Sequence, residues 1–67
     1  MISNEAVDAM MNVANMVAPN MQVRKAVGQM VQKMVAAEET NETIVLTLAS
    51  VIQDGVHYGN WPKREDG

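Results

Sequence analysis

The stretch VDAMMNVANMVAP, residues 7–19, is apolar around most of the circumference of a helix. When successive residues are placed about 100° apart, the polar residues of this stretch and of the turn before it fall in a single stripe about 100° wide. That stripe consists of Asn4, Glu5, Asp8, Asn12 and Asn15. One small core cannot cover the remaining surface, and monomers rarely expose large apolar patches. We therefore expect this helix to bury two faces, one inside its own chain and one against a partner.

The same spacing defines these two apolar faces. The first, which we assign to the core, contains Ala6, Met10, Val13 and Val17. The second is flatter, because its small residues permit close approach, and it contains Val7, Met11, Ala14 and Ala18. We predict that the second face, together with Met16, forms the interface between copies of the chain.

Start and stop signals predict the bounds of the first two helices. Ser3 is a good N-cap and Pro19 restricts the residue before it, so the first helix is expected over 3–17. Apolar residues spaced 4, 3, 4 and 3 apart predict a second helix over 20–38. These residues are Val23, Val27, Met30, Met34 and Ala37. Gly28, in the middle of that helix, is either a surface glycine or a point where another backbone comes close.

A third helix is expected over 41–54, with Thr40 or Asn41 as its cap. Gly55 would end it in the left-handed conformation, with Val56 folding back on Val51. The alternative for residues 43–48 is a strand, because TIVLTL is β-prone. With helix preferred, the sequence predicts an all-α, compact three-helix bundle over 1–56, followed by an irregular, partly disordered tail over 57–67.

The length of the chain, 67 residues, allows one domain and a small core. Such a chain buries only about 60% of the surface that its unfolded form exposes, and it usually needs a disulfide, a metal or oligomerisation. There is no cysteine and only one histidine. We therefore expect no disulfide, metal or cofactor, and we expect a homo-oligomer.

The charge balance argues against two classes of partner. Five basic and eight acidic residues give a net charge of −3, which is unfavourable for binding phosphate backbones. No apolar run reaches the roughly 20 residues needed to cross a bilayer, and the acidic start does not resemble a signal peptide. We expect a cytoplasmic protein without a membrane partner. Size alone would also suit an accessory protein of a phage or mobile element.

Catalysis has little support in the sequence. Ser50, Asp54 and His57 have the residue types of a triad, but the serine lies within a helix and no glycine-rich turn exposes it. Glu38, Glu39 and Glu42 lie at a helix junction and are typical of a solvated corner, since the loop ligands of a calcium site are missing. We expect no catalytic or metal site.

Both aromatic residues, Tyr58 and Trp61, lie in the tail segment HYGNWP. They either pack back to cap the bundle or anchor a partner, since Trp and Tyr dominate binding hot spots. Leu46, an apolar residue on the polar side of the third helix, is a further candidate for partner binding. Seven methionines suit a loosely fitted core and also an adaptable binding surface.

The sequence thus favours a small non-enzymatic protein–protein interaction module, an inhibitor, adaptor or regulator that acts as a homo-oligomer. The first alternative is a protein that sequesters a small ligand at the interface between protomers, through polar groups such as Asn12, Asn15 or Arg24. The third hypothesis is a DNA-binding regulator. It is disfavoured because the helix that would read the bases contains no Lys or Arg.

Overall fold

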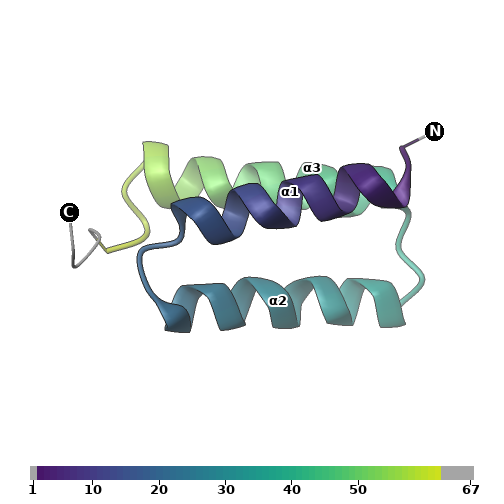
Figure 1. Cartoon of the computed structure of the whole chain (residues 1–67), viewed down its shortest axis with the longest axis horizontal. Helices are drawn as coiled ribbons and strands as arrows, with labels where there is room; N and C mark the ends of the chain where they lie inside the picture. The colour runs from purple at the N-terminus through teal and green to yellow at the C-terminus, as the bar shows by residue number, and fades with distance from the viewer. Residues whose placement is uncertain (1, 63–67) are drawn as a thin grey trace.

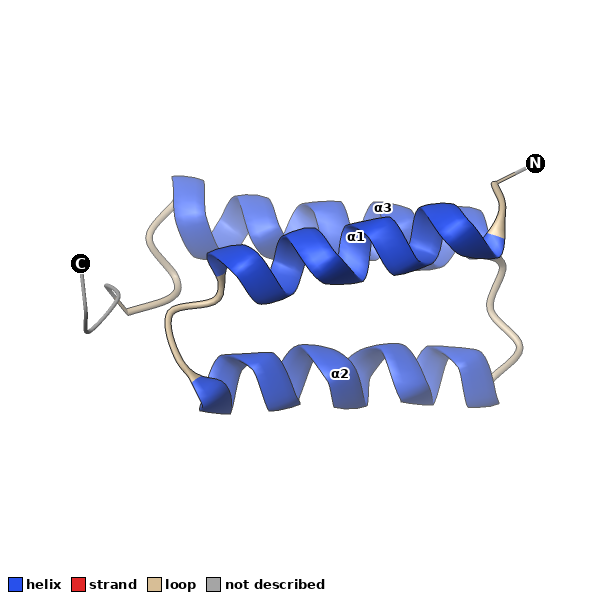
Figure 2. Cartoon of the chain, viewed as in Figure 1, coloured by secondary structure: helices blue, strands red, loops and turns tan. Residues whose placement is uncertain are grey.

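The computed structural model describes residues 2–62 and contains three α-helices (Figure 1). Helix α1 spans Asn4–Val17, α2 spans Met21–Ala36 and α3 spans Asn41–Ile52. A single π-helical turn, η1, continues α3 over Gln53–His57. Residues 2–62 contain no strand (Figure 2), so residues 43–48 are helical. The prediction of an all-α chain is confirmed.

Each α-helix begins at a polar side chain that accepts a backbone hydrogen bond. The carboxamide oxygen of Asn20 accepts the N–H of Val23 at 2.9 Å. The hydroxyl groups of Ser3 and Thr40 accept the N–H three residues ahead at 3.3 and 3.1 Å. Such a cap satisfies one of the free N–H groups of the first turn. The cap predicted at Ser3 is confirmed, and Thr40 rather than Asn41 caps α3.

The ends of α1 and α2 also follow local chemistry. Helix α1 ends two residues before Pro19, as predicted. Helix α2 ends at Ala36, two residues earlier than expected. Glu38 adopts the left-handed conformation, with φ of 59°, and the N–H of Glu39 donates to the carbonyl oxygen of Met34 at 3.0 Å. This is the Schellman arrangement, with glutamate where glycine is usual.

Helices α1 and α3 run in the same direction, and α2 runs antiparallel to both (Figure 1). Helix α1 packs more closely against α3 than either packs against α2. The side chain of Asn41 ties the two parallel helices together at their N-terminal ends. It donates to the carbonyl oxygen of Ile2 and to Oδ1 of Asn4, both at 3.0 Å.

The core is small. The buried apolar residues are Ala14, Ala18, Val27, Val31, Ile44 and Leu48. Among residues 2–62, only Ile44 and Leu48 are large side chains that are fully buried. Further apolar side chains, such as those of Met30 and Val51, are half-buried and pack around this centre. A single core of this size rarely supplies more than about 3–5 kcal/mol of stability.

The two apolar faces of α1 follow the sequence-based assignment only in part: Met10 packs against the core as predicted, but two of the residues predicted to meet another copy are buried as well. Ala14 and Ala18, predicted to meet another copy, are each 1% exposed in the core of the chain itself. Val7 and Met11 pack against that core. The small residues do permit close approach, but the helix that approaches is α3 of the same chain. Val13, assigned to the core, is instead 41% exposed.

Candidate functional site

The end of α3 differs from the expected stop at Gly55. Gly55 is buried within the turn η1, and Gly59 is the glycine in the left-handed conformation, with φ of 74°. The N–H of Trp61 donates to the carbonyl oxygen of Gly55 at 3.1 Å. Val56 does not fold back on the core, since it is 57% exposed. The chain therefore turns four residues later than predicted and brings Trp61 back under the helix.

Trp61 packs directly on Gly55. A Cβ atom at position 55 would lie 2.5 Å or less from three carbons of the indole ring, so only a glycine leaves room for this contact. Trp61 is half-buried and packs against the core. Of the two alternatives for the tail, Trp61 follows the first and caps the bundle. Tyr58, by contrast, is 66% exposed.

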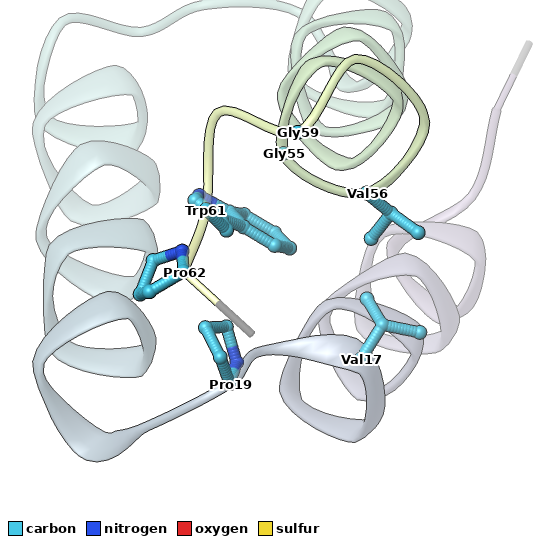
Figure 3. A pocket seen from close by; sticks show the side chains of 7 residues that line it. All are labelled: Val17, Pro19, Gly55, Val56, Gly59, Trp61 and Pro62. Carbon is cyan, nitrogen blue, oxygen red and sulfur yellow. The ribbon is translucent and has the colours of Figure 1, made fainter. Parts of the chain in front are cut away.

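A pocket of about 450 Å³ lies beside Trp61 at this end of the bundle (Figure 3). It is lined by Val17, Pro19, Gly55, Val56, Gly59, Trp61 and Pro62. In Figure 3 the side chains of Val17 and Val56 point toward each other, and Trp61 and the two prolines lie across the pocket from them. Four segments of the chain meet here: the end of α1, the loop after it, η1 and the tail.

The lining of the pocket is almost entirely apolar. Among residues 2–62, no ionisable side chain lines it, and the indole N–H is the only polar side-chain group of the lining. A volume of this size is sufficient for a small molecule or for one or two apolar side chains of a partner. The sequence interpretation named Trp61 but not Val17, Pro19, Val56 or Pro62. Their meeting depends on the turn at Gly59, and no spacing in the sequence reveals it.

The residues of the triad-like pattern do not form a site. Ser50, Asp54 and His57 are all exposed, and no hydrogen bond joins them within residues 2–62. The imidazole of His57 instead meets the ring of Tyr58 edge to face, with ring centroids 5.2 Å apart. The described part of the chain also contains no group of three His, Cys, Asp or Glu residues placed to hold a metal ion.

A second, shallow hollow lies between α1 and the start of α2. It is lined by Asn12, Asn15, Met16 and Arg24. The Nε–H group of Arg24 donates to the backbone carbonyl oxygen of Asn15 at 3.2 Å, which orients the guanidinium at the hollow. The structure therefore brings together the three polar residues that the sequence suggested for ligand binding.

The other predicted contact residues lie apart from the end pocket. Leu46 is exposed on α3, nearer the opposite end of the bundle, and Met16 is 71% exposed on α1. Neither lines the pocket, although Met16 lines the polar hollow. Tyr58 lies in the segment that carries the pocket, next to Gly59. Of the residues predicted to bind a partner, only Tyr58 and Trp61 are thus brought to the same end.

No family model matches this chain, and it matches none of the curated proteins or solved structures that were searched. Among residues 2–62, every helix is too short or too polar to cross a membrane.

Proposed function

We propose that this chain is a small non-enzymatic interaction protein, an inhibitor, adaptor or regulator that works as a homo-oligomer. The observation that carries the proposal is the apolar pocket beside Trp61, with the exposed Tyr58 next to it. A cytoplasmic location accompanies the proposal, because the chain has no cysteine with which to form a disulfide.

The pocket has the composition of a protein-binding hot spot. Hot spots are enriched in tryptophan and tyrosine and lie in apolar pockets from which water is excluded on binding. Trp61 already packs on Gly55 in the single chain, so its side chain would lose little conformational freedom when a partner binds. An apolar side chain of the partner fits the pocket, and Tyr58 offers a second contact beside it.

The test uses a carboxylate placed at the rim of the pocket. Pro62 is exposed and lines the pocket, so Pro62→Glu should fold normally and block an apolar guest. Ala36→Glu, at an exposed position at the far end of α2, is the control. Proteins retained from the native host by the wild type and the control are identified, and the affinity of each is then measured by calorimetry with purified components.

We expect Pro62→Glu to weaken the interaction by at least about 30-fold, which corresponds to a hot-spot loss of about 2 kcal/mol. Tyr58→Ala should weaken it as well. Equal affinity for the wild type and Pro62→Glu would show that the partner binds elsewhere. If the wild type binds no protein, the proposed function is wrong.

A second candidate function, sequestration of a small ligand, is favoured by the hollow at Arg24. The hollow is lined by Arg24 together with Asn12 and Asn15, and only the Nε–H group of the guanidinium is engaged with the backbone of Asn15. This chemistry suits a small carboxylate. Titration with acetate, followed by NMR of the backbone amides, should shift Asn15 and Arg24 in the wild type and leave them unshifted in Arg24→Gln. Absence of shifts in the wild type rules this candidate out.

A further inference from the structure

The contacts between α1 and α3 show that the two helices begin beside each other and end beside each other. At one end the side chain of Asn41 bonds to Asn4. At the other end Val17 of α1 and Val56, just after α3, line the same pocket and point toward each other (Figure 3). Since both helices run in the same direction, residues at corresponding places along them lie side by side (Figure 1).

Helical spacing extends the contact at Val17 and Val56 into a continuous apolar surface. Residues three, four or seven positions apart share one face of a helix. The surface, here called the outer face, consists of Ala9, Val13 and Val17 from α1 and of Val45, Ala49 and Val56 from α3 and η1. All six are exposed or half-buried.

The outer face is turned away from α2. Helix α2 borders the opposite, polar side of α1, because Arg24 at its start bonds to Asn15 and shares a hollow with Asn12. The six residues of the outer face all have apolar side chains, and Glu42 of α3 and Gln53 of η1 lie at its margin. A continuous apolar surface of this kind is unusual on a monomer.

We propose that a second copy of this chain packs on the outer face of α1 and α3. The proposal rests on the homo-oligomer of the proposed function and names its interface. A second copy is the occupant that suits the small core, because in the described part of the chain only two large side chains are fully buried, and the sequence has no cysteine for a disulfide. A partner that supplies missing stability must be present whenever the chain folds, and another copy of the chain meets that condition.

The dimensions of the molecule are compatible with a stable dimer. The described chain extends 36 × 18 × 18 Å. One long side therefore offers up to about 650 Å² per copy, and two copies reach the lower end of the roughly 1,200–2,000 Å² buried in stable interfaces. The outer face runs from Ala9 to Val17 and from Val45 to Val56, which is about 12–17 Å at 1.5 Å per residue. A dimer of this size must therefore also use the N-terminal turns of α1 and α3 beside the outer face.

The direction of the helices favours an antiparallel arrangement of the two copies. Because α1 and α3 are parallel, the positive ends of both helix dipoles lie at the same end of the bundle. A two-fold axis perpendicular to the helices places the N-terminal ends of one copy beside the C-terminal ends of the other. Ala9 and Ala49 lie within the face, and their short side chains allow the helices of the two copies to approach closely.

The test compares one substitution at two positions. Ala49→Glu places a charge within the outer face, whereas Ala26→Glu makes the same change at an exposed position of α2. Sedimentation equilibrium at about 100 µM, a concentration that detects weak dimers, should give twice the chain mass of 7.3 kDa for the wild type and for Ala26→Glu. Ala49→Glu should raise the dimer dissociation constant at least about 100-fold, since it brings carboxylates together in an apolar interface.

Ala9→Glu provides a second variant on the other helix, and circular dichroism identifies any variant that has lost its helices. If Ala9→Glu and Ala49→Glu both dimerise with the dissociation constant of the wild type, the interface lies elsewhere and only this inference fails. A wild type that is monomeric at about 100 µM overturns the inference together with the homo-oligomer of the proposed function. Val17 and Val56 belong to both the end pocket and the outer face, whereas Pro62 lines only the pocket and Ala9 and Ala49 belong only to the outer face, so the substitutions at Pro62, Ala9 and Ala49 test the two surfaces separately.

Discussion

Replacing Gly55 by alanine separates the backbone effect of a glycine from its packing effect. Gly55 lies within the helical turn η1 and not in the left-handed region, so its backbone accepts alanine. In a helix this change alone stabilises by up to about 1 kcal/mol. The new methyl group, however, would overlap three carbons of the Trp61 indole. The ring must therefore move off the end of the bundle.

The loss of Trp61 packing exceeds the gain from alanine. A half-buried tryptophan removes about 150 Å² from water, which at about 25 cal/mol per Å² contributes up to about 4 kcal/mol. Part of this loss is offset by the conformational entropy that the released tail gains. We expect Gly55→Ala to lower the free energy of unfolding by about 1–3 kcal/mol. Gly28→Ala is the control, because a Cβ there meets nothing within 4 Å, and it should stabilise by about 0.5–1 kcal/mol.

Urea denaturation followed by circular dichroism measures both free energies. Trp61 is the only tryptophan, so its fluorescence reports the movement of the ring directly. Emission should shift to longer wavelength in native Gly55→Ala and stay unchanged in Gly28→Ala. If Gly55→Ala is as stable as Gly28→Ala and its emission is that of the wild type, the contact between Trp61 and Gly55 does not exist in solution.

Three further substitutions test the core and the helix ends by the same urea assay. Leu48→Ala should destabilise by about 2–5 kcal/mol, because the side chain is fully buried; a loss below about 1 kcal/mol would contradict its place in the core. Asn20→Ala removes the cap of α2 and should cost about 1 kcal/mol, and an unchanged stability would show that the cap is not formed. Glu38→Gly should stabilise by about 1 kcal/mol, since glycine adopts a φ of 59° without strain, and destabilisation would exclude that conformation.

The helix starts could be predicted because they depend on a few neighbouring residues. Ser3 and Thr40 act within three residues of themselves, and Pro19 acts on the residue before it. The helical character of residues 43–48 was also predictable, because the apolar period continues beyond the β-prone run. At the C-terminal end, local signals were ambiguous. Gly55 and Gly59 both suit a left-handed position, and the choice between them depends on a ring two residues beyond Gly59.

The assignment of the two faces of α1 could not be made from spacing alone. Both faces are apolar and both repeat every three or four residues, so each is compatible with burial. What distinguishes them is the neighbouring helix. Ala14 and Ala18 are short enough for α3 to approach closely, and the closest packing in the bundle is the one between α1 and α3. The sequence interpretation recognised the close approach but placed it between copies.

The burial of Ala14 and Ala18 against α3 also determines which side of α1 is left for a second copy. Ala14 of α1 faces inward against α3. Because Val13 and Ala9 lie about 100–140° around the helix from Ala14, they face the surface. On that surface we place them on the same side of the bundle as Val45 and Ala49 of α3. The packing that builds the small core therefore also aligns the apolar residues of two helices on the surface. A charge at Ala49 acts on that surface while leaving the core untouched, because Ala49 is exposed in the single chain. Loss of the dimer with retention of the helices is the result that this arrangement requires.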